Sequence, residues 1–339
     1  MMLQRAFLSF GILLTAASLL AAQTPTKEAE QTQTSDADHD YVRMFQFSSD
    51  GKTIVVQTFD GTLLWWDLET RKLLRSKQTK SENATFDPQG KLLSIVRDKT
   101  GTRVIEVIAN QEVKSLEGAQ FTSLSKFAFS PDAKTLAFTE STQGIILKLW
   151  DVTTGKEKAS IERPDANDFL NTLLFSPDGQ MLAGLSHSIT LWSVSSGKPS
   201  RSIKIDAGLA RMAFTPEGKM ICVSGFDNAN PSFIKCFSVL SGREVLNVHA
   251  EPSSPFAFSP DGKMLAVVRS GEGIFLISAA TGRDIAKVTI SVGDSSLTQM
   301  SFSPDGKLLA AASDKGLVLL DPVAGKELFV LAQTSDAKQ

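Results

Sequence analysis

Short apolar runs alternate with polar turns along most of this chain, and one turn pattern recurs. Residues 302 to 307 give its fullest form, Phe-Ser-Pro-Asp-Gly-Lys. Proline presets the first corner of a turn, aspartate hydrogen-bonds its own backbone, and glycine supplies positive φ. Seven copies begin at Phe47, Phe86, Phe129, Phe175, Phe214, Phe258 and Phe302, which lie 39 to 46 residues apart. This period with strand-like content predicts an all-β fold, a seven-bladed β-propeller of four-stranded antiparallel blades.

A second landmark follows each of these phenylalanines by 17 to 23 residues. It is a large apolar residue that ends another apolar run: Trp66, Ile105, Trp150, Trp192, Phe237, Ile277 and Leu320. Five positions later stand Arg71, Asn110, Gly155, Gly197, Gly242, Gly282 and Gly325, mostly residues suited to a left-handed turn. Each repeat therefore predicts strand a, the Pro-Asp-Gly turn, strand b, a variable loop, strand c, a glycine turn and strand d.

Three positions depart from this pattern. Ser49 replaces the proline of the first turn, and Ala133 replaces the glycine of the third. We expect these two turns to be looser than the others or of another type, because each lacks a residue that presets the backbone. Arg71 is the misfit among the residues of the second turn.

The repeats resemble the WD40 family and the wider group of WD40-like bacterial propellers. The resemblance rests on Leu-Trp-Asp-Val-Thr-Thr-Gly-Lys at residues 149–156, Trp-Trp-Asp-Leu at residues 65–68 and the seven turns. It covers residues 40–332 and implies a propeller that presents binding surfaces. The Gly-His pair that often precedes strand a in that family is missing, so we expect the blades to be held by apolar packing.

The ends of the chain differ in composition from the repeats. Residues 1–22 resemble a signal peptide: Arg5 provides a positive start, an apolar stretch follows, and Ala21 and Ala22 close it. Residues 23–39 form a polar, flexible tail, residues 40–332 the propeller, and residues 333–339 a C-terminal tail. We expect a periplasmic or secreted protein without a membrane span in the mature chain. The last repeat supplies its own strand d, which predicts ring closure by packing between blades.

Charge and cysteine content narrow the possible partners. The formal net charge of −2 and the absence of a basic stripe give no electrostatic support for nucleic-acid binding. Cys222 and Cys236 are equidistant from Ala229, so they face each other across a hairpin. They are either a disulfide, which export permits, or two buried thiols. With three histidines in separate regions, we expect no metal site, no cofactor and no catalytic residue.

Strand a is the innermost strand of a propeller blade, so its first residues should surround one mouth of the central channel. The residue three before each motif phenylalanine is polar in five of seven repeats. These five are candidate binding residues at the channel mouth: Asn83, Lys126, Thr172, Arg211 and Gln299. Lys126 and Arg211 could hold an anionic group or an acidic peptide. The alternative is that they are solvated rim residues.

Three functions fit this pattern. The first is a monomeric, non-catalytic scaffold that binds another protein or peptide. The second is a propeller enzyme such as a lactonase, which requires carboxylates or histidines in the channel. The third resembles the periplasmic propeller of the Tol system, which requires a further N-terminal domain that residues 23–39 are too short to form. Converging acidic groups in the channel favour an enzyme, whereas a mixed rim favours a scaffold.

Overall fold

The computed structural model describes residues 42–78, 84–86, 92–98, 101–106, 111–116, 118–119, 125–141, 145–161, 170–205, 207–227, 232–251, 254–269, 271–291, 297–313 and 316–331. These residues form β-strands and turns and belong to one compact unit that begins at Asp36. No membrane-spanning helix is found among them. The proposed signal peptide, the polar tail and Asn83 lie outside the described residues.

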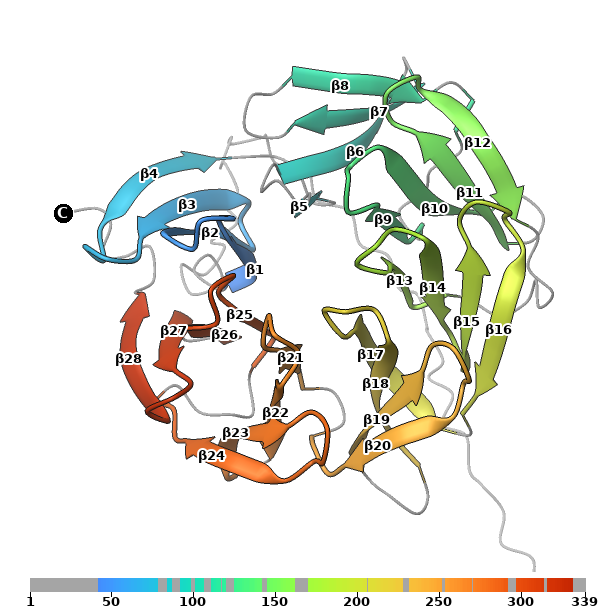
Figure 1. Cartoon of the computed structure of the whole chain (residues 1–339). Helices are drawn as coiled ribbons and strands as arrows, with labels where there is room; N and C mark the ends of the chain where they lie inside the picture. The colour runs from blue at the N-terminus through green and yellow to red at the C-terminus, as the bar shows by residue number, and fades with distance from the viewer. Residues whose placement is uncertain are drawn as a thin grey trace, which may run out of the picture. The chain divides into compact units, whose positions relative to one another are not determined.

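The strands form seven four-stranded antiparallel sheets, which confirms the predicted propeller (Figure 1). Each sheet is one blade and contains four consecutive strands. The first four blades are β1 (Val42–Phe47), β2 (Thr53–Thr58), β3 (Thr62–Asp67) and β4 (Leu73–Gln78); β5 (Ala84–Phe86), β6 (Leu92–Asp98), β7 (Gly101–Glu106) and β8 (Gln111–Leu116); β9 (Phe127–Phe129), β10 (Thr135–Ser141), β11 (Ile145–Asp151) and β12 (Lys156–Ile161); and β13 (Thr172–Phe175), β14 (Met181–Leu185), β15 (Ser188–Ser193) and β16 (Pro199–Lys204).

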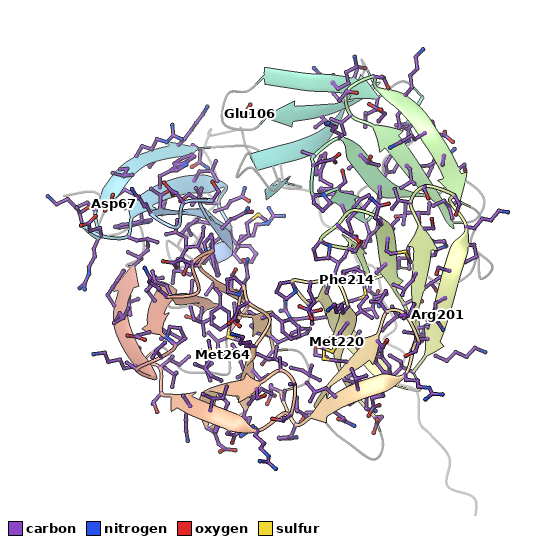
Figure 2. The ribbon with its side chains drawn as sticks, in the orientation of Figure 1. Asp67, Glu106, Arg201, Phe214, Met220 and Met264 are labelled. Atoms are coloured by element: carbon purple, nitrogen blue, oxygen red, sulfur yellow. A yellow bond between two sulfur atoms is a disulfide. The ribbon has the colours of Figure 1, made fainter. Side chains whose placement is uncertain are left out.

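The last three blades follow the same order. They are β17 (Gly208–Phe214), β18 (Met220–Phe226), β19 (Phe233–Ser238) and β20 (Glu244–Val248); β21 (Ala257–Phe258), β22 (Met264–Arg269), β23 (Gly273–Ser278) and β24 (Asp284–Val288); and β25 (Gln299–Phe302), β26 (Leu309–Ser313), β27 (Gly316–Asp321) and β28 (Lys326–Leu331). Because β28 completes the last sheet from its own repeat, no strand is exchanged between the ends of the described chain. Figure 2 shows Phe214 toward the centre of the ring and Arg201 toward its outer edge.

Apolar packing between neighbouring blades holds the sheets together. Six buried clusters among the described residues each combine side chains of two adjacent blades. One of them joins the last blade to the first, with Leu317 and Leu319 of β27 packed with Phe45 and Ile54. Burial of apolar surface is the main favourable term in folding, and here it is distributed over the blade interfaces. The expected closure by packing is therefore confirmed.

The Pro-Asp-Gly turns also contact one another from blade to blade. A methyl group added at Gly179 would lie 3.4 Å from Cδ of Pro131, the proline of the preceding turn. The same relation joins Gly218 to Pro177, Gly262 to Pro216, Gly306 to Pro260, and Gly51 to Pro304 across the closure. In these five pairs, proline and glycine do more than shape their own turn, because the proline ring of one blade lies close to the glycine of the next.

The turns at Ser49 and Ala133 have the same backbone hydrogen bond as the other described turns, so the expectation that they would differ is wrong. The N–H of Gly51 donates to Ser48 O at 2.9 Å, and that of Ala133 donates to Ser130 O at 2.8 Å. The Ser48 hydroxyl donates to Asp50 at 2.6 Å, as the equivalent serine does in the proline-containing turns at Ser130, Ser176, Ser259 and Ser303. The serine–aspartate pair holds the turn without proline, and Ala133 adopts a φ of 58°.

Strand d carries a β-bulge at the same place in every blade, a feature that we did not predict. The pairing between strands c and d shifts at the landmark residue in all seven sheets: Trp66, Ile105, Trp150, Trp192, Phe237, Ile277 and Leu320. A bulge bends and twists the strand that carries it. Strand d is the outer edge of each blade, and a twisted edge is a poor template for pairing with another chain.

Candidate functional site

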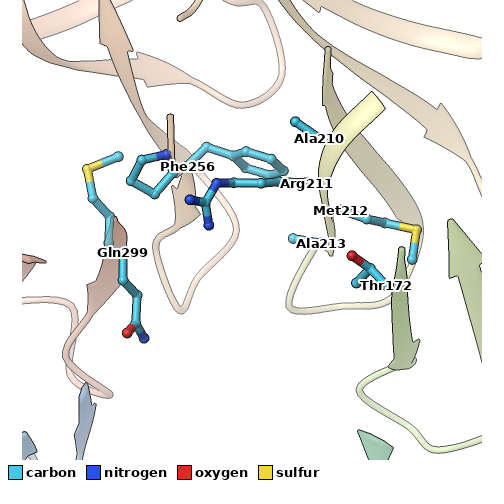
Figure 3. A pocket seen from close by; sticks show the side chains of 9 residues that line it. Thr172, Ala210, Arg211, Met212, Ala213, Phe256 and Gln299 are labelled. Carbon is cyan, nitrogen blue, oxygen red and sulfur yellow. The ribbon is translucent and has the colours of Figure 1, made fainter. Parts of the chain in front are cut away.

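A pocket of about 470 Å³ opens at the inner ends of four adjacent blades (Figure 3). It is lined by residues of the fourth to seventh blades: Thr172, Ala210, Arg211, Met212, Ala213, Pro255, Phe256, Gln299 and Met300. Its volume lies within the range of about 300–1,000 Å³ typical of small-ligand sites. The pocket is therefore large enough for one or two amino-acid side chains of a partner.

Strand a positions the polar groups of this pocket. Thr172 begins β13, Arg211 lies in β17, and Gln299 begins β25. Each stands three residues before the phenylalanine that leads into the Pro-Asp-Gly turn, so the repeat brings them to equivalent places. Three of the five candidate residues thus line one pocket, on the side of the channel away from those turns.

Arg211 is the one charged side chain among the described residues that line the pocket. A bulge in the pairing of β17 with β18 lies between Leu209 and Arg211 and redirects the side chains at this point of the strand. Arg211 is half-buried, and burial lowers the pKa of its guanidinium below the usual value. The group remains a cation at neutral pH, because an arginine guanidinium does not lose its proton in proteins. The pocket therefore presents one partly desolvated positive charge.

The amide of Gln299 is bound to the neighbouring blade. Its Nε2 donates to the carbonyl of Phe45 at 3.0 Å, and its Oε1 accepts the N–H of Phe45 at 3.0 Å. This pair of hydrogen bonds joins β25 of the last blade to β1 of the first, 254 residues away in the sequence. Gln299 consequently has a structural function at the ring closure and forms a fixed wall of the pocket.

Lys126 lies apart from this pocket. Its side chain is exposed, it does not line the cavity, and its N–H donates to the hydroxyl of Thr139 at 2.9 Å. The structure therefore does not bring Lys126 and Arg211 together in one pocket. Asn83, the remaining candidate, falls on a position outside the described residues.

The sequence did not predict that the pocket is lined by only four of the seven blades, or that its remaining wall is apolar. Met212, Phe256 and Met300 each lie two residues before a motif phenylalanine, directly after the position of the candidate residues. All three are buried. The sequence shows an apolar residue at this position of strand a in every repeat. No sequence pattern indicated the bulge before Arg211 or the bridge from Gln299 to Phe45.

Cys222 and Cys236 are direct partners in the antiparallel pairing of β18 with β19, as their spacing predicts. The structure joins them by a disulfide with an S–S distance of 2.08 Å. Both are fully buried in the cluster between the fifth and sixth blades. The bond therefore lies in the blade core, away from the residues that line the pocket.

The described residues contain no group of three or more histidine, cysteine, aspartate or glutamate side chains that could hold a metal. The lining of the pocket likewise includes neither a carboxylate nor an imidazole among the residues described. Acid–base and metal-assisted reactions need such groups within reach of a substrate. The described lining therefore presents one cationic side chain and no carboxylate or imidazole.

Comparison with known proteins agrees with the repeat pattern. The family model described as WD domain, G-beta repeat matches residues 287–321. The chain is 29% identical over 152 residues to WD repeat-containing protein SL1-17 of Schistosoma mansoni, and 30% identical over 148 residues to the U3 small nucleolar RNA-associated protein 21 homolog of Schizosaccharomyces pombe. It is 24% identical over 205 residues to Periodic tryptophan protein 2 of Arabidopsis thaliana.

These alignments cover 44%, 42% and 59% of this chain, and 48%, 16% and 22% of the three relatives. Among solved structures, the Kuenenia stuttgartiensis hydrazine synthase is similar with a TM-score of 0.64 and 18% identity, over 87% of this chain and 99% of that chain. At that identity the likeness shows the fold alone. The chain is thus similar over part of its length to WD40 repeat proteins, and its described strands form the seven four-stranded blades of a β-propeller.

Proposed function

We propose that this protein is an exported, non-catalytic scaffold that binds another protein or peptide at the pocket around Arg211. The observation that carries the proposal is the composition of the pocket: one cation, a hydroxyl and an apolar wall, at the inner end of four blades. Such a mixed concave surface suits recognition of a protruding side chain. Relatives built from WD repeats, which are generally interaction scaffolds, support the same function.

The propeller-enzyme alternative has less support. A lactonase or a glycosidase needs carboxylates or histidines that converge on a substrate. The lining residues described here are an arginine, a threonine, a glutamine and apolar side chains. The described lining therefore contains no carboxylate or histidine that could catalyse the hydrolysis of a lactone or sugar.

Export is supported by the composition of residues 1–22 and by the buried Cys222–Cys236 bond. Structural disulfides persist in oxidising compartments and are rare where thiols are kept reduced. We propose that the mature chain is periplasmic or secreted and acts there as a monomer.

A capture experiment from the cell envelope tests the function and the location together. Tagged full-length protein is produced in its source cell, cross-linked in the isolated envelope fraction and recovered with its partners. The Arg211→Met variant keeps the long side-chain stem but removes the charge, and Lys126→Ala is the matched control, since Lys126 lies outside the pocket. We expect the wild-type and control proteins to retain a partner that Arg211→Met loses.

Three results would contradict the proposal. Recovery of the protein from the cytoplasm, with none in the envelope, would overturn export. A partner retained equally by the wild-type and Arg211→Met proteins would move the binding surface away from the pocket. Turnover of lactones by the wild-type protein, abolished in Arg211→Met, would replace the scaffold with an enzyme.

A further inference from the structure

We infer that a second pocket, in the crevice between the third and fourth blades, binds one cationic side chain, an arginine or a lysine, of a partner protein. The juxtaposition that carries this inference is a pair of turn carboxylates, Asp132 and Asp178, beside apolar residues in a pocket of about 430 Å³. The inference goes beyond the proposed function, because this pocket shares no lining residue with the pocket around Arg211.

A short side chain at the start of strand b leaves this crevice open. Thr135 begins β10, and of the other repeats only the first has an equally short residue there, Thr53. The remaining five repeats have leucine or methionine at this position: Leu92, Met181, Met220, Met264 and Leu308. Met181, Met264 and Leu308 pack against the buried clusters that join their blades to the next. Threonine is too short to fill the equivalent space between the third and fourth blades.

The apolar part of the pocket suits an aliphatic stem. Leu149, Ala159 and Val194 line it, and all three belong to the one cluster between the third and fourth blades. Arginine and lysine cover apolar surface with their stems while the charged head stays in a polar environment. The volume lies in the range of small-ligand sites, so the pocket has room for one long side chain.

Two ionised carboxylates border this apolar surface. Asp132 and Asp178 lie on turns that contact each other, since a methyl group added at Gly179 would lie 3.4 Å from Cδ of Pro131. Each carboxylate accepts its turn hydrogen bonds through Oδ1, whereas Oδ2 accepts none from the described residues. The serine hydroxyl is the largest cause that lowers the pKa of each carboxyl, so both are ionised at neutral pH.

The fourth turn lacks the lysine that accompanies this aspartate in the other repeats. Gln180 stands where the other six repeats have lysine. In the sixth blade that lysine, Lys263, pairs with Asp261 at 3.6 Å, and the seventh blade has the equivalent pair at 3.4 Å. Asp178 forms no such ion pair with the described residues. A cation from a partner can therefore take the place of the missing lysine.

The balance of charge favours a cationic ligand. Lys158 is the one cation of the described lining, and its Nζ donates to the hydroxyl of Thr135 at 3.2 Å. Two carboxylates against one ammonium leave one negative charge unbalanced. A single guanidinium or ammonium group neutralises that charge, whereas an anion would add to it.

Blocked amino acids test this site in the full-length protein. Isotope-labelled protein is titrated with N-acetyl-arginine methylamide, with the lysine counterpart and with N-acetyl-citrulline methylamide, which resembles arginine but carries no charge. The backbone amide signals of Gly179, Gln180 and Ser195 report binding at the crevice. We expect arginine and lysine to bind about three- to tenfold more tightly than citrulline at low salt, because solvent-exposed ion pairs contribute modestly. Added salt should reduce this preference.

Two variants restore residues that other repeats carry, so they keep the fold. Thr135→Met should fill the pocket, and Gln180→Lys should supply the missing cation; we expect each to lose the preference for arginine. Asp178→Asn should lose it too, whereas Asp261→Asn, the same change in the sixth turn, should not. Lys158→Met should strengthen arginine binding about two- to threefold, because it removes a like charge.

Equal binding of arginine and citrulline, or signal changes that avoid the crevice, would overturn the inference. A preference for arginine that persists in both Thr135→Met and Gln180→Lys would do the same. Weaker binding to Lys158→Met would contradict the argument from charge. The titration involves neither Arg211 nor an envelope partner, so its result is independent of the proposed function.

Discussion

Two residues other than glycine adopt a left-handed backbone in the described part of the chain, Arg71 and Ala133. Each stands where the other repeats have glycine or another residue suited to positive φ. Arg71 has a φ of 58°, and its guanidinium lies 4.3 Å from the ring centroid of Phe329 in the last blade. A cation–π contact of this kind contributes about 0.5–1 kcal/mol at an exposed site. The contact offsets part of the backbone cost and links the first blade to the last.

Ala133 offers a test of backbone strain in the third turn. A left-handed backbone costs an L-residue with a Cβ about 1–2 kcal/mol. We expect Ala133→Gly to raise the free energy of unfolding by about 0.5–1 kcal/mol, because relief of strain exceeds the added entropy of the unfolded chain. The measurement is urea denaturation followed by tryptophan fluorescence.

The matched control reverses the change in the next blade. Gly179 has a φ of 71°, and a methyl group there would also approach Cδ of Pro131. Gly179→Ala should therefore lower the free energy of unfolding by about 1 kcal/mol or more. Ala133→Gly would contradict the argument if it destabilised the protein while Gly179→Ala behaved as expected.

The recurrent turn is the element that links sequence to pH dependence. In five copies the aspartate accepts a hydrogen bond from the serine two residues before it and from the N–H two residues after it: Asp50, Asp132, Asp178, Asp261 and Asp305. The serine hydroxyl is the largest cause that lowers the pKa of each carboxyl, followed by the backbone N–H. The ionised form therefore favours the folded state.

Acid should weaken the turn at Asp305. Because its folded-state pKa lies below the reference value of 3.8, its contribution to stability is complete above that value and is lost as the pH falls through the folded-state pKa. Asp305→Asn keeps an acceptor for Ser303 and Lys307 but carries no charge. We expect the wild-type protein to exceed this variant in urea midpoint at about pH 6, and the gap to be smaller at about pH 2.5, below the reference value of 3.8.

Removal of the serine donor provides the control for that experiment. In a Ser303→Ala background the carboxyl of Asp305 loses the hydrogen bond that most lowers its pKa. The gap caused by Asp305→Asn should then be smaller at about pH 6. A gap that is the same at both pH values would show that the charge of Asp305 is irrelevant to the turn.

At the scale of the whole molecule, the junction between the last and first blades holds the ring closed. Three kinds of contact meet there: the apolar cluster, Pro304 on Gly51, and the bridge from Gln299 to Phe45. No strand crosses this junction in the described chain, so packing and side-chain hydrogen bonds bear the closure.

Gln299→Leu tests this junction. The leucine fills similar space but leaves the N–H and carbonyl of Phe45 without the amide, and an unsatisfied buried polar group costs about 1–3 kcal/mol. We expect a loss of that size in the free energy of unfolding, measured by urea denaturation. Gln299→Glu should fall between the wild type and Gln299→Leu, since it can accept the N–H but lacks the donor.

Lys126→Ala is the control on an equivalent position of strand a. Its exposed side chain should contribute less than about 0.5 kcal/mol. If Gln299→Leu were as mild as Lys126→Ala, the bridge would contribute nothing to closure, and apolar packing alone would hold the ring.

The sequence by itself determined the fold. Seven turns and seven landmark residues in register predicted the strand order, since each turn needs residues with particular φ preferences and each strand needs apolar ones. The sequence also predicted that Cys222 and Cys236 face each other, because they are equidistant from Ala229 in one hairpin. These features are local, because they depend on residues that are near one another in the chain.

Tertiary structure decided how the repeats meet. The bulge at each landmark residue, the bridge from Gln299 to Phe45 and the separation of Lys126 from the pocket depend on packing between blades. Equivalent positions in a repeat look alike in sequence, but their neighbours differ from blade to blade. The repeat therefore indicated which residues reach the channel mouth, and only the packed ring selected Thr172, Arg211 and Gln299 to line one pocket.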